Sequence, residues 1–163
     1  MKDVLFRGKT AKGEWIYGFY LQEYQDNGQI KHYILRSWFD GTRVFKHKDM
    51  VIPETVGQFT GLTDNNCKKI FEGDIVKFFD MVGKVCFEQG CFGIGANNLI
   101  DWEKLEEQIF PITRCDNEPY FLYNDFFVSF WELLWNYCAE ENCDVCEIIG
   151  NIHDNPELLE VEQ

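Results

Sequence analysis

The sequence lacks any long hydrophobic run. No stretch approaches the roughly 18 consecutive apolar residues that a membrane-spanning helix requires. The first fifteen residues, MKDVLFRGKTAKGEW, also lack the apolar centre of a signal peptide. These two absences exclude the common patterns of membrane and secreted proteins, so we expect a soluble cytoplasmic protein.

Basic residues are scarce in the last third of the chain. Residues 101–163 contain two Lys and Arg against sixteen Asp and Glu, a net charge of −14, whereas residues 1–50 contain nine against six, a net charge of +3. Nucleic acid binding needs cations that neutralise phosphates, so we expect no direct contact with nucleic acid. A partner with a basic surface, or the basic end of a neighbouring copy, is favoured instead. The simpler alternative is that the net charge of −13 keeps the protein in solution.

Sequence motifs for catalysis are also lacking. The three His residues lie far apart, and no motif frames a Ser or Cys nucleophile. The glycine-rich run at 90–95 has no following Lys-Ser/Thr step, so it does not match a phosphate-binding loop. Glu72 and Asp74 could share one face of a strand, but the Gly between them favours a structural turn. We therefore predict no catalytic residues, no cofactor and no enzyme activity.

The seven cysteines form no recognisable disulfide or metal pattern. Without a secretion signal they are expected to be reduced thiols, most of them buried. Cys143 and Cys146 form a C-x-x-C pair, which Cys138 and His153 could complete as a zinc site. Because this spacing is unusual and a second C-x-x-C is missing, ordinary thiols are favoured over zinc binding or redox chemistry.

Hydrophobic and aromatic residues are abundant, at 45% and 17% of the chain. This supplies a packed interior for a single domain over residues 1–163, with the alternative of two β lobes, about 1–60 and 61–163, that share a core. Residues 14–21 alternate in the manner of a strand, and Asn27-Gly28 predicts a hairpin to a partner strand over 30–38. Short strands at intervals of about 8–12 residues recur after it. We therefore predict a mainly β fold: a small barrel, pseudo-barrel or sandwich of short antiparallel strands.

The stretch GLTDNNCKKIFEGDIV, residues 61–76, combines a polar turn with an acidic step. Asp and Asn accept hydrogen bonds from nearby backbone amides and tolerate left-handed conformations, so residues 63–69 predict a tight turn. A new strand should begin near Ile70, with Gly73 as a bulge or a point of close approach. We interpret the stretch as a turn rather than a binding site.

One or two short helices are expected in the second half. Asp101 is placed to cap a helix over 100–109, and Ser129 with Glu132 fits a capping box before a second helix. That second helix is apolar around most of its surface, so the domain or a partner subunit must cover it. We predict an interface there, built from Phe130, Trp131 and Trp135.

The run GNIHDNP near the end of the sequence is dense in hydrogen-bonding groups. Asn151 and His153 are candidates for contact with a ligand or partner. The favoured alternative is a turn in which Asp154 and Asn155 accept backbone hydrogen bonds and Pro156 fixes the exit.

Four segments in order carry a family resemblance: FRGKTAKGEWIYGF, IPETVGQFTGLTDNNCKKIFEGDIVKF, GKVCFEQG and EIIGNIHDNPELL. Together they closely resemble the YopX family of bacteriophage and prophage proteins. The resemblance implies a mostly β, phage-encoded protein that self-associates and has no established biochemical activity. The family usually has Gly where this chain has Cys67, so Asn66 is expected to take the left-handed position in that turn.

Three functional hypotheses remain at this point. The first is an accessory protein of the host-cell cytoplasm that assembles with itself and contacts a host or phage protein. The second is an acidic mimic of DNA that occupies a basic nucleic-acid-binding host protein. The third is a small-molecule-binding protein or metal-dependent enzyme with a pocket between the β core and a helix.

Overall fold

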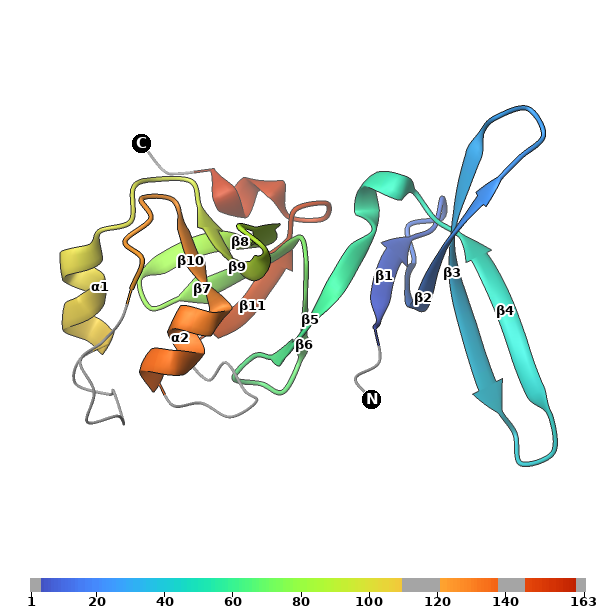
Figure 1. Cartoon of the computed structure of the whole chain (residues 1–163), viewed down its shortest axis with the longest axis horizontal. Coiled ribbons are helices and arrows are strands. Elements are labelled where there is room, and N and C mark those ends of the chain that lie inside the picture. Colours follow the sequence, from blue (N-terminus) through green and yellow to red (C-terminus); the bar gives the residue numbers. More distant parts are fainter. Residues whose placement is uncertain (1–3, 110–120, 138–145, 161–163) are drawn as a thin grey trace. The chain divides into compact units, whose positions relative to one another are not determined.

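The computed structural model describes residues 4–109, 121–137 and 146–160. Strands dominate it, which confirms the prediction of a mainly β fold. Among the described residues the strands form two antiparallel sheets rather than a closed barrel, and two short α-helices lie in the second half, where one or two were expected. The chain divides into two compact units, Met1–Phe59 and Thr60–Gln163, here called unit 1 and unit 2 (Figure 1). Neither α-helix among the described residues is long and apolar enough to cross a membrane.

Unit 1 is a ladder of antiparallel strands. Its hydrogen-bonded order is β4-β3-β2-β1-β5, and a single 3-10 turn precedes β5. The elements are β1 (Phe6–Lys9), β2 (Trp15–Tyr24), β3 (Ile30–Phe39), β4 (Val44–Met50), η1 (Pro53–Thr55) and the start of β5 (Gly57–Thr63), which continues into unit 2. The expected hairpin joins β2 to β3, with Gly28 at φ 80° and the Asn27 side chain accepting from the Gln29 amide.

β2 changes partners at Gly18. Its first residues, from Trp15 to Gly18, pair with β1, and residues from Phe19 to Tyr24 pair with β3. A Cβ atom at position 18 would lie 2.3 Å from the carbonyl oxygen of Leu35, so the close approach requires glycine. This bend lets the β2–β3 and β3–β4 hairpins project as separate arms of unit 1 (Figure 1).

The core of unit 1 is small. Ile16, Ile34 and Val51 are buried, with Phe6, Tyr20 and Val56 packed partly against them. β4 pairs with β3 along its whole length, but β2 covers β3 only as far as Leu35. The outer part of the β3–β4 arm is therefore a two-stranded ribbon, and such a ribbon alone buries little apolar surface.

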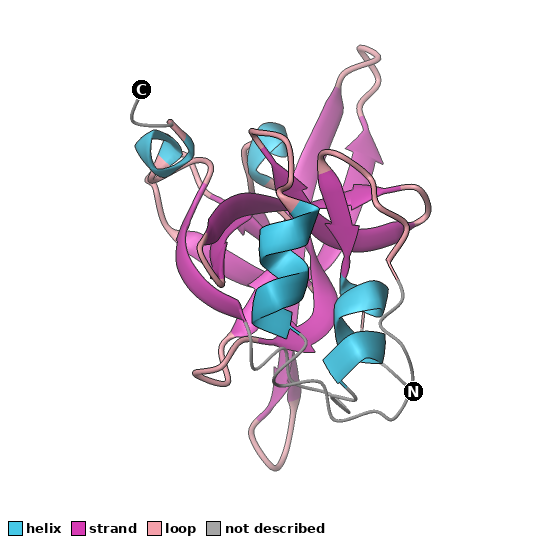
Figure 2. Ribbon diagram, turned by 90° about the vertical axis from the view of Figure 1, so that its left-hand side faces the viewer, coloured by secondary structure: helices cyan, strands magenta, loops and turns pink. Residues whose placement is uncertain are grey.

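Unit 2 holds the larger core. The five-stranded sheet has the order β10-β9-β8-β7-β11, and β6 pairs with the end of β5. Its elements are β6 (Lys69–Phe71), β7 (Asp74–Phe78), β8 (Met81–Glu88), β9 (Cys91–Ala96), α1 (Trp102–Ile109), β10 (Phe127–Ser129), α2 (Phe130–Tyr137), β11 (Cys146–Asn151) and η3 (Pro156–Leu159). In Figure 2 both α-helices lie on the near side of the strands. Leu105 of α1 and Leu133 of α2 join Val76 and Ile94 in one buried cluster.

Two details of the predicted turns are wrong. Cys67, not Asn66, takes the left-handed conformation, with φ 60°. The Asp64 carbonyl accepts from the Cys67 amide, and the Asp64 amide donates to the Lys68 carbonyl, which makes a three-residue loop whose third residue must be left-handed. Of the two alternatives for Gly73, the bulge within one strand is also wrong: at φ 80° it lies in the turn that separates β6 from β7, where its amide donates to the Val85 carbonyl and its carbonyl accepts from the Ile152 amide.

Candidate functional site

The predicted interface on α2 is divided between core and surface. Phe130 is only 3% exposed and belongs to the core of unit 2, because β10 leads directly into the helix at this point. Trp131 is 53% exposed and lies on the outer side. The side chain of Trp135 lies outside the described residues. Phe130, one of the three aromatic residues expected to face a partner, therefore packs in the core of unit 2.

The capping box before α2 forms as predicted. The Glu132 carboxylate accepts from the Ser129 amide at 2.9 Å and from the Ser129 hydroxyl at 2.6 Å, and the Ser129 hydroxyl accepts from the Glu132 amide at 3.1 Å. The same carboxylate accepts from the Leu122 amide at 2.6 Å. Glu132 is 2% exposed, so its charge is held by backbone and hydroxyl donors rather than by water. This buried carboxylate has a structural role.

Asn151 and His153 lie in the turn between β11 and η3. The Asn151 side-chain oxygen accepts from the backbone amides of His153 and Asp154, each at 3.0 Å, and its amide group donates to the Asp154 carboxylate. The turn-forming acceptor is therefore Asn151, rather than Asp154 or Asn155 as expected, and Pro156 opens η3. Contact of Asn151 or His153 with a ligand remains a prediction.

The acidic turn stretch binds its own backbone. Asp64 is 1% exposed and accepts from the amides of Asn66, Lys68 and Ile148 at 2.8–3.1 Å. Asp74 is 2% exposed and accepts from the Phe71 amide at 2.8 Å. Glu72, the other half of the acidic step, is half-buried, but the burial of Asp74 in a hydrogen bond to a backbone amide makes the Glu72–Asp74 pair unsuited to solvent-accessible acid–base chemistry.

The candidate zinc ligands are only partly described. Cys146 is fully buried in β11, and His153 lies in the following turn, whereas Cys138 and Cys143 fall outside the described residues. Within the described ranges no three His, Cys, Asp or Glu side chains are grouped to hold a metal ion. Elsewhere, burial raises the pKa of the Cys86 thiol to about 12, helped by its hydrogen bond to Glu88, so that thiol is a poor nucleophile.

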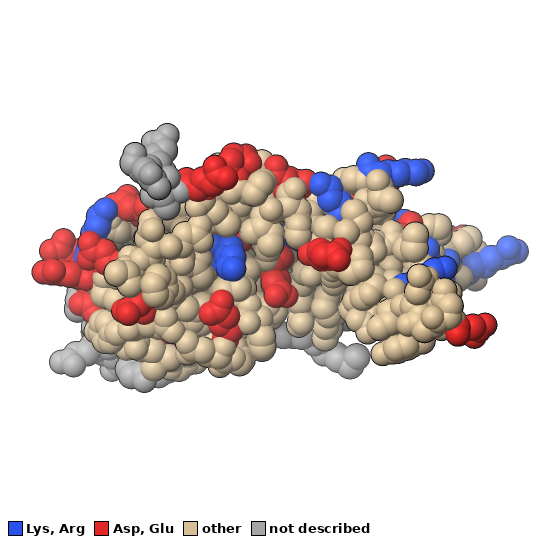
Figure 3. All heavy atoms as spheres, turned by 90° about the horizontal axis from the view of Figure 1, so that it is seen from above, with Lys and Arg blue, Asp and Glu red and all other residues tan. Residues whose placement is uncertain are grey.

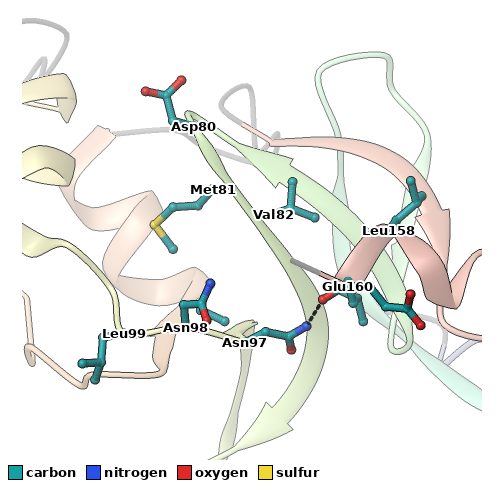
Figure 4. A pocket seen from close by; sticks show the side chains of 10 residues that line it. Asp80, Met81, Val82, Asn97, Asn98, Leu99, Leu158 and Glu160 are labelled. Atoms are coloured by element: carbon teal, nitrogen blue, oxygen red, sulfur yellow. Dashed lines mark hydrogen bonds between the residues drawn. The ribbon is translucent and has the colours of Figure 1, made fainter. Parts of the chain in front are cut away.

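A cavity of about 330 Å³ opens in unit 2 between β8, the loop after β9, and η3 (Figure 4). Its wall is mixed: Asp80, Asn97, Asn98 and Glu160 are polar, and the rest is apolar, from Met81, Val82, Ala96, Leu99, Leu158 and Leu159. Asp80 pairs with Lys104 at 3.1 Å and accepts from Gln108 at 2.7 Å, and these two hydrogen bonds, that from Lys104 foremost, lower the pKa of its carboxyl group. The Asn97 amide donates to the Leu159 carbonyl at 2.5 Å and ties the two walls together. The lining residues include no nucleophile with a base beside it.

A more extensive candidate surface lies on one face of the unit 1 ladder. Alternation places the side chains of Tyr17, Phe19 and Leu21 of β2 on this face, and they are 37–50% exposed. Register adds Leu35 opposite Phe19, and Met50, 57% exposed, opposite Tyr33. We call this set the aromatic face. Several exposed apolar side chains on one face are typical of an interaction site.

Lys48 marks the basic edge of the aromatic face. Its Nζ atom lies 4.2 Å from the centre of the Tyr33 ring and 2.6 Å from the Glu23 carboxylate. On the opposite face of the ladder, Arg36 contacts Asp49 at 2.6 Å, and His47 contacts the same carboxylate at 3.0 Å. Each face of the β3–β4 arm therefore carries a basic side chain, Lys48 on one and Arg36 on the other, next to apolar ones.

Charge divides sharply between the units. Residues 1–59 contain nine Lys and Arg against seven Asp and Glu, a net charge of +2, whereas residues 60–163 contain six against twenty-one, a net charge of −15. On the side drawn in Figure 3, Lys and Arg gather over unit 1 and Asp and Glu predominate over unit 2. The aromatic face therefore belongs to the less acidic unit.

Sequence reasoning missed the aromatic face. β2 carries apolar residues in both alternation phases, with Ile16 and Tyr20 in one and Tyr17 and Phe19 in the other. A strand covered on one side only should alternate apolar with polar residues. Apolar residues in both phases were the available signal that the second side of this ladder also carries apolar side chains.

Comparison with known proteins identifies a matching protein family and one similar solved structure. The family model described as "YopX protein" matches residues 5–160. Among solved structures, the crystal structure of protein EF1440 from Enterococcus faecalis is similar to this chain, with 20% sequence identity and a TM-score of 0.44. The match covers 98% of this chain and 100% of that one. No curated protein matches the chain.

Proposed function

Because the chain belongs to the YopX family, we propose that it is a phage- or prophage-encoded accessory protein that acts by self-assembly and protein binding rather than by catalysis. Family membership points to the phage association. The observation that supports a binding role is the aromatic face, where Tyr17, Phe19 and Met50 are each about half exposed. Covering these apolar side chains with a partner surface lowers the free energy of the complex.

The difference in net charge between the two units favours head-to-tail assembly. Unit 1 carries a net charge of +2 and unit 2 a net charge of −15. Contact between unit 1 of one copy and unit 2 of the next reduces the repulsion that two acidic units would feel. Such a contact joins two different surfaces, so it continues from copy to copy in a ring or a filament.

Light scattering after size exclusion at micromolar concentration tests the proposal. Self-assembly gives a mass well above the 19.3 kDa of one chain, and Phe19→Ser should lower that mass. Tyr24→Ser is the matched control, because Tyr24 is 76% exposed in unit 1 but lies on the opposite face of β2. A strictly monomeric wild-type protein would contradict self-assembly.

A second candidate function follows from the charge of unit 2 alone. A net charge of −15 within residues 60–163 suits a protein that occupies the basic surface of a nucleic-acid-binding host protein. Capture of such a protein from host lysate at low salt, followed by release at about 0.5 M salt, is the expected behaviour. Retention that does not change with salt contradicts this candidate.

A further inference from the structure

The outer edge of β4 presents backbone hydrogen-bonding groups away from the ladder. β4 ends the sheet, with β3 on one side. The Val51 amide donates to the His32 carbonyl at 2.9 Å, and the Asp40 amide donates to the Arg43 carbonyl at 3.2 Å. These two bonds show that odd-numbered residues of this segment bond toward β3. Because the direction alternates along a strand, the N–H and C=O groups of the even-numbered residues point outward.

The residues whose backbone groups point outward are Val44, Lys46, Lys48 and Met50. Their order along β4 places two lysines between two apolar residues. All four are exposed, Val44 and Met50 at 64% and 57%. No hydrogen bond among the described residues engages their backbone groups. An edge of this kind is a template for one more strand.

We propose that the free edge of β4 binds an extended acidic segment of a partner protein, which adds to the ladder as a further antiparallel strand. The inference rests on the proposed binding role and names the class of partner, but it does not depend on self-assembly. Backbone hydrogen bonds to the outward groups supply affinity, and the side chains that lie beside the edge supply specificity.

Charge repulsion disfavours β4 of a second copy as the strand that pairs with this edge. Antiparallel pairing of two β4 strands with full overlap is centred on His47, and this register sets Lys46 opposite Lys48 twice. Like charges directly opposite each other destabilise a strand pair. An acidic strand in the same place converts both repulsive pairs into attractive ones. The lysines therefore select against self-pairing and for carboxylates.

The edge also defines the preferred pattern of the partner strand. Carboxylates should lie opposite Lys46 and Lys48, with apolar residues opposite Val44 and Met50. On the other side of the new strand, the residue opposite Phe45 should be apolar, because Phe45 is 39% exposed and stacks on Trp38. The probe is the fluorescently labelled peptide Val-Thr-Glu-Thr-Glu-Phe-Val, capped at both ends, which meets all these conditions in antiparallel register.

Fluorescence anisotropy with this peptide and the whole chain tests the inference. Two cross-strand ion pairs should make the peptide bind roughly threefold to thirtyfold more tightly than the version with Lys in place of both Glu. Binding should weaken at about 0.5 M salt. N-methylation of the two Glu amides, which removes backbone donors and leaves every side chain in place, should abolish binding.

Protein variants separate the edge from general charge attraction. Lys46→Glu should reverse the preference, so that the Lys peptide binds better than the Glu peptide. Lys46→Pro removes an outward N–H without removing a bond to β3, and it should weaken binding more than Lys46→Ala, which keeps the N–H. Circular dichroism establishes that each variant is folded.

Three outcomes overturn the inference: undiminished binding of the N-methylated peptide, an unchanged preference in Lys46→Glu, or the absence of binding at about 1 mM peptide. The peptide measurements use the wild-type chain, so they remain decisive if a variant fails to fold. Failure of peptide binding in a protein whose mass still exceeds 19.3 kDa overturns this inference alone and leaves self-assembly standing.

Discussion

Trp38 stacks on Phe45 across the β3–β4 arm, with ring centres 5.5 Å apart and planes inclined by 12°. Both rings remain accessible, at 52% and 39% of their surface. On the other face of the same ribbon, Phe39 and Val44 are each 64% exposed. The arm is therefore apolar on both faces although its own unit covers neither, which is the arrangement expected of a segment that inserts into a partner surface.

Trp38→Ala should weaken self-assembly with little effect on the fold. The ring is half exposed, so we expect its loss to reduce the free energy of unfolding by about 1 kcal/mol or less. Light scattering should show a lower mass at equal concentration. Trp131→Ala tests the interface predicted on α2, because Trp131 is exposed to the same extent there. If Trp131→Ala dissociates the assembly and Trp38→Ala does not, the interface lies on α2 instead.

Glu132→Ala should destabilise unit 2 strongly. Glu132 is 2% exposed, and its carboxylate accepts from the amides of Ser129 and Leu122 and from the Ser129 hydroxyl. Removing it leaves buried donors unsatisfied, at a cost of about 2–4 kcal/mol. Ser129→Ala, which loses the N-cap acceptor and one donor to that carboxylate, should cost about 1–2 kcal/mol. Urea unfolding followed by circular dichroism measures both, and equal losses would contradict this assignment of roles.

The capping box and Asp101 were predictable because their partners lie within a few residues. Ser129 and Glu132 are three apart, and Asp101 accepts from the Lys104 amide at 3.1 Å. The bond from the Ile148 amide to Asp64 spans 84 residues, and no local pattern specifies it. The sequence alone therefore predicted the hairpins and helix starts, while the pairing of β11 with β7 needed the tertiary structure.

The polar part of β4 was hard to predict for a related reason. Lys46, His47 and Lys48 interrupt the apolar pattern by which a strand is recognised in a sequence. The strand continues to Met50 since its backbone bonds to β3 do not require apolar side chains. Polar residues are common on edge strands, where charges limit unwanted pairing. Lys46 and Lys48, which would give the proposed edge site its specificity, are also the residues that make β4 hard to recognise in the sequence.

Asp64→Asn should loosen the link between the β5–β6 turn and β11. The wild-type carboxylate accepts from Asn66 and Lys68 in the turn and from Ile148 in β11. An amide has one acceptor oxygen in place of two, so we expect a loss of about 1–3 kcal/mol in the free energy of unfolding. Hydrogen exchange should show the Ile148 amide exchanging faster. Unchanged protection of that amide would contradict the link.

Cys67→Gly should stabilise the protein. Cys67 has φ 60°, a conformation that costs a residue with a Cβ atom about 1 kcal/mol relative to glycine. Glycine loses more backbone entropy on folding, so the expected net gain is a few tenths of a kcal/mol up to about 1 kcal/mol. Cys67→Ala is the control, since alanine keeps the Cβ atom and should give no such gain. Thermal unfolding under reducing conditions compares the three proteins.

Cys86 should react with alkylating reagents far more slowly than the exposed Cys67. With a pKa of about 12, only about one Cys86 thiol in ten thousand is deprotonated at pH 8. Timed exposure to iodoacetamide, read by mass spectrometry of each cysteine peptide, should show a difference of about a hundredfold or more. The Cys86 rate should rise about tenfold per pH unit while the fold persists. Comparable rates at pH 8 would contradict the burial of this thiol.

The same raised pKa makes stability depend on pH in a definite direction. The ordinary thiol pKa is 9.0 and the folded value is about 12, so the unfolded chain loses its Cys86 proton first as the pH rises. The stabilisation from the neutral thiol is therefore complete below about pH 9 and is lost as the pH approaches 12. Urea unfolding of the wild type and of Cys86→Ala between pH 8 and about 10.5 isolates this contribution, because the other titrating groups are common to both. The wild type should lose stability more steeply than Cys86→Ala, and parallel curves would contradict a partly buried, neutral Cys86.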